Sequence, residues 1–315
     1  MNSLFLIVLL CTYFCCKKEE LKSEVILKEE VLQPHVQLEG KPTYIDSTSL
    51  ISFHNKVLTD FYKSTNYRTV WQSKEKREVI LDKLFKSDQE GLNPEDYNIG
   101  KLFDFEKKAT ILDSLDLAKY DILLTSSLQK YISHLTNGRL NPLKLYKNWD
   151  LKENEIDINA TVVQLLQSDS LAYKIEQLKP NHIVYKKLKK ALQLINTFPK
   201  DNFKPIKFTK TILANDTNPS VIDIKKRLIY WKELQPKDSL TPVYDEETVM
   251  ALKKFQSRHG LAIDAKIGPG TIASLNFSKN QRTQQILVNL ERWKWYPKQM
   301  GKEYIIINIP DYKLT

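Results

Sequence analysis

Apolar residues recur every three or four positions through the middle of the chain, which is the spacing of one face of an α-helix. Each such stripe predicts a helix that turns this face to a core. Turn residues separate the stripes: Gly91 ends one segment, Asn93 and Pro94 begin the next, and Gly138 ends the longest helix. Residues 46–215 are therefore predicted to form a helical domain. The stripes are Leu50, Phe53, Val57 and Phe61; Leu117, Tyr120, Leu124, Leu128, Tyr131 and Leu135; and Leu188, Leu192 and Ile195.

Residues 216–278 repeat the helical spacing on a smaller scale. Asn218 and Pro219 predict the start of a helix, Asp245 is suited to cap a second one, and Gly260 to end it. A short third helix follows. The pattern predicts a compact module of three helices, whose apolar faces are Val221, Ile224, Leu228 and Trp231; Val249, Leu252 and Phe255; and Ile272 and Leu275.

The last segment, residues 279–315, changes character. Ile286, Leu290 and Trp293 predict one more helix over residues 281–295, and residues 304–309 form a β-prone run of Tyr-Ile-Ile-Ile-Asn-Ile. After a turn at Pro310 and Asp311, a second strand begins. No other run of strands is present, so the first strand is expected to lack a partner and to open a β-rich domain that continues beyond residue 315. The predicted fold class is mainly α with this orphan strand.

The N-terminus is read as an export signal. The apolar run from Leu4 to Cys16 has thirteen residues, whereas a spanning helix needs about twenty. Its length suits the apolar segment of a signal peptide, here residues 1–16. A cysteine that ends such a run and precedes Lys17 and Lys18 is similar to the lipidation site of a bacterial lipoprotein, which makes Cys16 the candidate. Residues 17–45 are expected to be a flexible tether, and the protein to be exported to the cell envelope or periplasm and held to the membrane by its lipid.

Charge and composition narrow the function. The formal net charge is +10 and the three cysteines, Cys11, Cys15 and Cys16, all precede the predicted domains. A basic balance suits an anionic partner or simply a solvated, lysine-coated surface. Because only seven of the 48 basic residues are arginine, the composition argues against a nucleic-acid reader, which would favour arginine. The five histidines lack metal-ligand spacing and no phosphate-binding glycine loop is present, so neither a metal nor a cofactor is expected.

The second helix of the module carries a more specific pattern. Phe255-Gln256-Ser257-Arg258-His259-Gly260-Leu261, followed by Asp264, Ile267-Gly268 and Thr271, resembles the three-helix peptidoglycan-binding module. The resemblance implies peptidoglycan as the partner, and the candidate ligand-binding residues are Gln256, Arg258, His259 and Asp264. Alternatively, Arg258 and His259 only cap the helix C-terminus, and the module acts as a spacer. Ala265 departs from the family, which usually has glycine after the aspartate.

The chain after residue 46 is similar, over most of its length, to the large murein L,D-transpeptidases. The resemblance rests on Tyr62, Trp71, Gly91-Leu92, Gly138-Arg139 and on the runs Asn289–Trp295 and Tyr304–Pro310. That family joins a helical scaffold domain, a wall-binding module and a β-rich catalytic domain, which crosslinks stem peptides in cell-wall biogenesis through a cysteine thiolate activated by histidine. No cysteine follows Cys16, so no catalytic residue can be assigned, and the chain as it stands is expected to be inactive.

Three hypotheses follow. The first is the scaffold and peptidoglycan-binding portion of an L,D-transpeptidase, cut short at the start of the catalytic domain. The second is a genuine non-catalytic peptidoglycan-binding lipoprotein. The third is a basic helical binder of nucleic acid, which the export signal and the lysine bias oppose.

Overall fold

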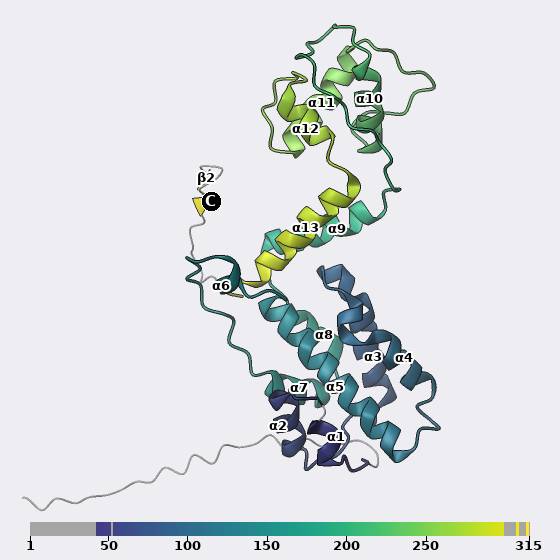
Figure 1. The fold of residues 1–315 in the computed structure, drawn as a ribbon, viewed down its shortest axis with the longest axis vertical. Helices are drawn as coiled ribbons and strands as arrows, with labels where there is room; N and C mark the ends of the chain where they lie inside the picture. Colours follow the sequence, from purple (N-terminus) through teal and green to yellow (C-terminus); the bar gives the residue numbers. More distant parts are fainter. Residues whose placement is uncertain (1–41, 52, 299–306, 309–312, 315) are drawn as a thin grey trace, which may run out of the picture. The chain divides into compact units, whose positions relative to one another are not determined.

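The structure, a computed structural model, describes residues 42–51, 53–298, 307–308 and 313–314. All of them belong to one compact unit, His35–Thr315. Helices dominate this part of the chain (Figure 1), which confirms the predicted mainly α fold. The predicted signal segment, Cys16 and residues 17–41 of the predicted tether lie outside the described residues. Among the described helices, none combines the length and the apolar character needed to cross a membrane.

The first helices form what we call the helical body. Its elements are α1 (Ser47–Ile51), α2 (Lys56–Ser64), α3 (Lys74–Phe85), the 3-10 helices η1 (Lys86–Glu90) and η2 (Pro94–Tyr97), α4 (Ile99–Lys107), α5 (Ser114–Asn137), α6 (Pro142–Leu145), α7 (Ile158–Leu166) and α8 (Leu171–Gln177). The module that follows contains α10 (Ser220–Tyr230), α11 (Glu246–Arg258) and α12 (Pro269–Leu275). Two longer helices flank the module: α9 (Ile183–Asn196) and α13 (Lys279–Lys294).

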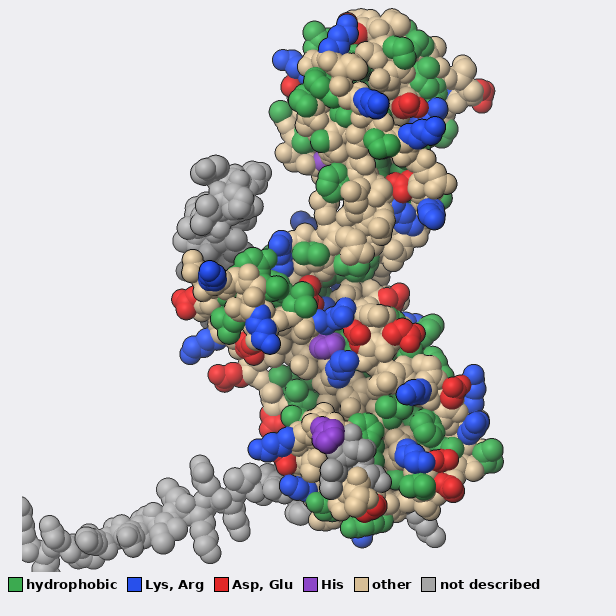
Figure 2. Space-filling view, viewed as in Figure 1, with side chains coloured by type: hydrophobic (Ala, Val, Ile, Leu, Met, Phe, Trp, Pro, Cys, Tyr) green, Lys and Arg blue, Asp and Glu red, His purple; other side chains and the backbone are tan. Residues whose placement is uncertain are grey.

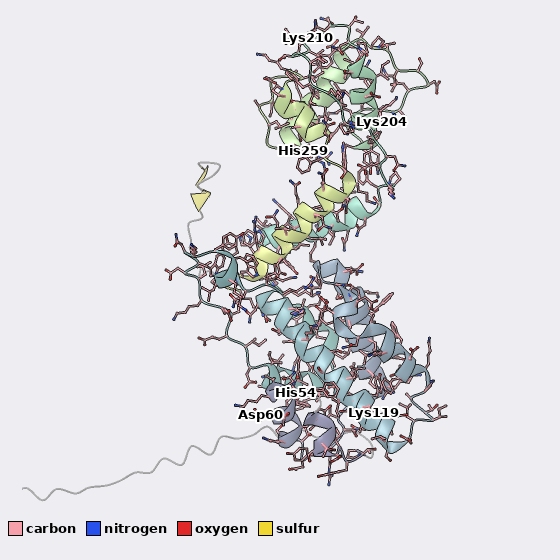
Figure 3. The ribbon with its side chains drawn as sticks, in the orientation of Figure 1. His54, Asp60, Lys119, Lys204, Lys210 and His259 are labelled. Carbon is pink, nitrogen blue, oxygen red and sulfur yellow. The ribbon has the colours of Figure 1, made fainter. Side chains whose placement is uncertain are left out.

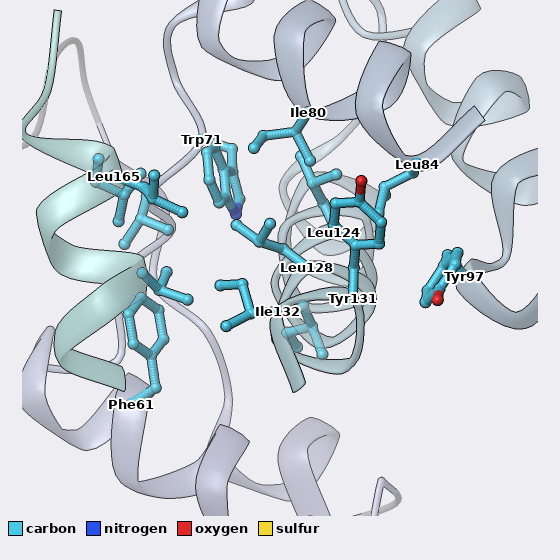
Figure 4. Packing of buried hydrophobic residues seen from close by; sticks show 14 of the residues in the cluster. Phe61, Trp71, Ile80, Leu84, Tyr97, Leu124, Leu128, Tyr131, Ile132 and Leu165 are labelled. Atoms are coloured by element: carbon cyan, nitrogen blue, oxygen red, sulfur yellow. The ribbon is translucent and has the colours of Figure 1, made fainter. Parts of the chain in front are cut away.

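Helix α5 is the centre of the helical body. Its predicted stripe is confirmed, because Tyr120, Leu124, Leu128, Tyr131 and Leu135 are buried and Leu117 is only partly exposed. Ile80 of α3 and Leu165 of α7 join Leu124 and Leu128 in one core (Figure 4). Each side chain of this size contributes about 1.5–3 kcal/mol when it leaves water, so this stripe is a main source of the stability of the body.

A buried polar cluster lies within the same core. The carboxylate of Asp121 accepts hydrogen bonds from the backbone N–H groups of Val70 and Trp71, both at 2.8 Å, and from the Tyr62 hydroxyl at 2.7 Å. The indole N–H of Trp71 donates to Thr125 at 2.9 Å. Burial raises the pKa of Asp121 to about 6. Tyr62 and Trp71, which carry part of the family resemblance, thus hold α2 and the segment after it against α5.

The stripe from Leu50 to Phe61 does not form one helix, and this prediction is wrong. His54 has a left-handed backbone (φ +46°), and Asn55 begins a new helix because its side chain accepts from the N–H of Leu58 at 3.2 Å. A good N-cap residue can end the preceding helix by starting another. Leu50 and Phe61 are buried as expected, whereas Phe53 and Val57 are exposed.

Helices α9 and α13 form an antiparallel pair (Figure 1). The ring of His182, at the start of α9, stacks on Trp293 near the end of α13, with ring centroids 4.1 Å apart. At the other end, the Lys279 ammonium donates to the carbonyl oxygen of Phe198. The predicted helices carrying Leu192 and Leu290 are therefore confirmed, and they are partners of each other. The module is the segment that connects them.

The module has the predicted three helices. Asp245 caps α11 by accepting from the N–H of Thr248 at 2.9 Å, and Gly260 follows α11 with φ +66°. Leu252 and Phe255 are fully buried, as are the apolar residues of α10, Val221, Ile224 and Leu228. Ala265 has φ +57°, a left-handed conformation that glycine adopts more readily. The departure from the family at this position is therefore a site of backbone strain.

Four described residues near the C-terminus form a two-stranded antiparallel sheet. β1 (Ile307–Asn308) pairs with β2 (Lys313–Leu314), with Ile307 opposite Leu314. The expectation that the first strand lacks a partner is wrong for these residues, because the second predicted strand supplies the partner. The rest of the predicted strand, residues 304–306 and 309, lies outside the described residues.

Candidate ligand-binding groove

A groove of about 390 Å³ lies where the module meets the helix pair. The module contributes Trp231, Arg258 and His259. The helix pair contributes apolar side chains of α9, among them Leu194 and Ile195, and polar side chains of α13: Arg282, Gln285 and Asn289. Figure 3 labels His259 on the side of the module that faces α13. We call this cavity the groove.

Local structure places the module's three groove residues. Trp231 is the C-cap of α10, and His259 is the C-cap of α11, whose last residue is Arg258. Gly260 then turns the chain away with its left-handed backbone, so that the N–H of Leu261 bonds to the carbonyl of Gln256 at 2.9 Å. The ends of two helices therefore present an aromatic ring, an imidazole and a guanidinium side by side.

The two arginines of the groove, Arg258 and Arg282, differ in whether an acid pairs with them. Arg258 makes an ion pair with Glu233, 2.8 Å between Nη1 and Oε1, and the Glu233 side chain is only 4% exposed. Arg282 donates from Nη2 to the carbonyl oxygen of Ser274 at 2.7 Å and from Nη1 to the Nδ1 atom of His259 at 3.2 Å. Its guanidinium lies 5.0 Å from the ring centroid of Trp231, a cation–π contact.

Burial decides the protonation states of Arg282 and His259. Burial lowers the pKa of Arg282 to about 10, so the guanidinium stays charged at neutral pH. Burial, together with the charges of Arg282 and Arg258, lowers the pKa of His259 to about 4. The imidazole is therefore neutral. Since a guanidinium only donates hydrogen bonds, the bond from Arg282 makes Nδ1 the acceptor and leaves the proton on Nε2.

The four candidate residues divide into two groups. Arg258 and His259 line the groove, and they also occupy the helix C-terminus, so the two alternatives for them are compatible. Gln256 is 1% exposed and lies behind the groove wall. Its amide nitrogen donates to Asp264 at 3.0 Å, and its amide oxygen accepts from the N–H of Ala265 at 3.0 Å. Gln256 and Asp264 thus shape the loop between α11 and α12.

The polar groove residues on α13 were not identified in the sequence, although a signal was present. Arg282 lies one helical turn before Ile286, on the same face as Ile286, Leu290 and Trp293. A charged residue on an otherwise apolar stripe needs either a partner or a function. That conflict between the type of residue and its face marks Arg282 in the sequence alone.

Such an arrangement is suited to binding a ligand. Apolar walls with an aromatic ring and a few converging polar groups are typical of ligand sites. The side chains described above supply hydrogen-bond donors and one paired carboxylate, and no thiol. Within the described residues, no group of three or more histidine, cysteine, aspartate or glutamate side chains could hold a metal ion.

The helix pair joins the groove to the helical body. At the far end of α13, the buried Lys294 donates to the carbonyl oxygen of Glu90 at 3.0 Å, and Glu291 accepts from the backbone N–H of Leu140 at 2.8 Å. Gly138 is needed there, because a Cβ atom on it would lie 2.6 Å from the Glu291 carboxylate. The motifs around Gly91, Gly138 and residues 289–295, far apart in sequence, meet at this junction.

Comparison with protein families finds two matching segments of the chain. Residues 56–192 match the family model described as "Scaffold domain", and residues 217–275 match the one described as a "peptidoglycan binding domain". Helix α13 lies outside both matches. No curated protein matches the chain. The second match supports peptidoglycan binding and an association with the cell envelope. The chain thus combines segments similar to a scaffold domain and to a peptidoglycan-binding domain, as expected of a multi-domain protein associated with peptidoglycan.

Proposed function

We propose that this protein binds peptidoglycan in the groove and holds it at a fixed place relative to the helical body. The observation that carries the proposal is that Arg258 and His259, within the segment similar to a peptidoglycan-binding domain, line a cavity of ligand size. Trp231, which is 8% exposed, contributes an apolar part of the groove wall. The neutral His259 and Asn289 supply polar contacts that orient a ligand.

We further propose that the chain is the scaffold and wall-binding part of a protein related to the large murein L,D-transpeptidases. The order of the two matched domains agrees with that family. Residues that resemble it also meet at one junction, where Gly91 lies against Leu290 and Gly138 against Glu291. Its role would be to bind and position the wall for crosslinking, since these 315 residues have no cysteine after Cys16. Residues 1–16 would direct export.

The lipid anchor at Cys16 belongs to the same proposal. Two acyl chains hold a protein stably to a membrane. Replacing Cys16 by serine is expected to move the protein from the membrane fraction to the soluble fraction of the envelope. A Cys16→Ser variant that stays with the membrane would exclude this anchor.

Binding is tested by co-sedimentation of the full chain with purified cell-wall sacculi. We expect most of the protein in the pellet at low salt, and less of it after Ala191→Phe, because this residue lines the groove and a phenyl ring would fill it. Ala273→Phe, on the exposed side of α12, is the matched control and should sediment like the wild type.

Two results would contradict the proposal. If the wild-type protein stays in the supernatant at low salt, it does not bind peptidoglycan. If Ala191→Phe sediments as well as the wild type while Ala273→Phe does not, the ligand lies on the α12 surface and the groove is not the site.

A further inference from the structure

Arg282 is a charged group that the fold leaves only partly satisfied. A guanidinium has five N–H donors, and two of those in Arg282 make the bonds to Ser274 and His259. Its Nε atom is buried and makes no hydrogen bond among the described residues. No carboxylate within that part of the chain forms an ion pair with it, and burial alone lowers its pKa.

Other partly buried cations form ion pairs with acids. Lys179 and Lys189 both reach the carboxylate of Glu90, and Arg77 makes two bonds to Glu106, at 2.9 and 3.1 Å. Arg227 also makes no ion pair with a described residue, but its charge interacts with Asp201 and Asp223, and it does not line the groove. The cation of Arg282 is therefore left without an acid at the place where a ligand would enter.

The other groups in the groove point to the kind of ligand that would pair with it. The charges of Arg258 and Glu233 cancel each other. His259 is neutral, and its Nε2–H is a second donor beside Arg282. The groove therefore has one uncompensated positive charge, N–H donors next to it, and aliphatic walls from Leu194, Ile195 and Ile286. That combination fits an anionic acceptor attached to small apolar groups.

We infer that the groove binds a carboxylate of the peptidoglycan stem peptide, with Arg282 as the residue that determines this specificity. The inference rests on the proposed function and deepens it, because the free carboxylates of peptidoglycan are in its stem peptides, whereas its sugars offer hydroxyl and amide groups. A carboxylate would accept from the free donors of the guanidinium, which makes a charge-assisted hydrogen bond. The aliphatic walls would contact the short side chains of the peptide.

Arg282 lies on α13, outside the segment that matches the peptidoglycan-binding domain. The binding site is therefore composite: the module supplies one wall and the helix pair supplies the charge. It follows that the site recognises the carboxylate only when the module packs on α9 and α13, as it does in the full chain.

The test compares three soluble ligands by calorimetry on the wild-type full chain. They are a muropeptide with free stem carboxylates, the same muropeptide with those carboxylates amidated, and a peptide-free glycan fragment. We expect the free-acid muropeptide to bind at least about tenfold more tightly than either of the others, the size of effect usual for a hydrogen bond to a charged group. Equal binding of the acid and the amide would overturn the inference, even if the sacculus assay shows binding.

Variants place the preference on the residue. Arg282→Gln keeps hydrogen-bonding capacity without charge, and we expect it to bind the acid and the amide equally. Arg292→Gln, an exposed arginine elsewhere on α13 that donates to the Tyr146 hydroxyl, is the matched control and should keep the full preference. Thermal unfolding shows whether each variant is folded. Should Arg282→Gln not fold, Arg282→Lys retains the charge and should retain part of the preference; a folded variant without charge that still prefers the acid would assign the specificity elsewhere.

Discussion

The two ends of α13 bury charge in opposite ways. At its C-terminal end, Glu291 accepts backbone N–H groups and the buried Lys294 donates to the carbonyl of Glu90, 3.0 Å away, so these groups have partners within the protein. At its N-terminal end, the partly buried Arg282 forms no ion pair with an acid among the described residues. The same helix therefore serves stability at one end and, in our proposal, binding at the other. Removing one partner of a buried charge pair strongly destabilises a fold, whereas a charge that lacks an acid can pair with a ligand.

The largest expected effect comes from removing the carboxylate of Glu90, which lies near the C-terminal end of α13. Glu90 pairs with Lys179 at 2.7 Å and with Lys189, and it accepts from the Tyr185 hydroxyl at 2.9 Å. Glu90→Gln leaves Lys189 without an acid among the described residues and Lys179 with Glu176 alone, which should lower the free energy of unfolding by about 3–5 kcal/mol. Urea denaturation measures this loss.

Two further substitutions, both expected to be less destabilising, serve as comparisons. Asp60→Asn breaks an exposed ion pair with Lys63 and should cost no more than about 1 kcal/mol. Arg282→Gln should cost clearly less than Glu90→Gln, because it removes a charge that was not paired. If Arg282→Gln and Glu90→Gln prove equally destabilising, the contrast between the two ends of α13 is wrong.

Gly138 is expected to give the next largest effect. Its backbone, φ +78° and ψ 177°, lies in a region that only glycine adopts readily, and an added Cβ would collide with Glu291 and Trp295. Gly138→Ala should therefore cost about 2–3 kcal/mol in the same assay. Gly100→Ala in α4, where a Cβ meets no atom within 4 Å, should instead stabilise the protein slightly. A harmless Gly138→Ala would mean that α13 is not held closely at this junction.

Acidification should lower the stability of the helical body, through His134, and of the groove, through His259, by less than the substitutions above. Burial lowers the pKa of His134, whose Nδ1 is 2.9 Å from the Tyr97 hydroxyl, to about 4, and the pKa of His259 is likewise about 4. The unfolded chain takes up these protons near pH 6.5. The stabilising contribution is thus complete above pH 6.5 and is lost as the pH falls toward 4. After allowance for solvent screening, each histidine should account for about 1 kcal/mol.

Asparagine variants separate the two contributions. His134→Asn and His259→Asn keep an acceptor near the Nδ1 position but do not titrate. Each should lose less stability than the wild type between pH 7 and pH 4.5, as measured by urea denaturation at both values. Parallel losses in all three proteins would show that these histidines do not contribute to the acid response.

The smallest expected effect is a gain. Ala265 has φ +57° and its N–H bonds to Gln256. Ala265→Gly relieves the left-handed strain but also gives the unfolded chain more freedom, so the net gain should be below about 1 kcal/mol. A differential thermal scan would detect it as a small rise in the unfolding temperature. A drop in that temperature would indicate that the methyl group packs usefully in the loop.

Local signals predicted much of this fold. The N-cap at Asp245, the glycine stop at Gly138 and the apolar stripe of α5 each depend on a few neighbouring residues, and each is confirmed. The break at His54 was not predicted, because the apolar spacing continues through it while the capping strength of Asn55 decides the structure. The composite groove was not predicted either. It depends on the pairing of α9 with α13, which lie on opposite sides of the module in sequence, and no local pattern encodes that contact.

The antiparallel pairing of α9 and α13 also decides how mechanical load would pass through the molecule. The module is joined to the rest of the chain by the C-terminal end of α9 and the N-terminal end of α13, so a pull on bound wall material would draw both helices lengthwise in the same direction. The contacts at their far ends, Tyr185 and Lys294 with Glu90 and Glu291 with the backbone after Gly138, would share the force at the same moment. Bonds loaded together resist rupture better than bonds that peel one after another. A module carried between two paired helices is thus suited to a polymer under tension.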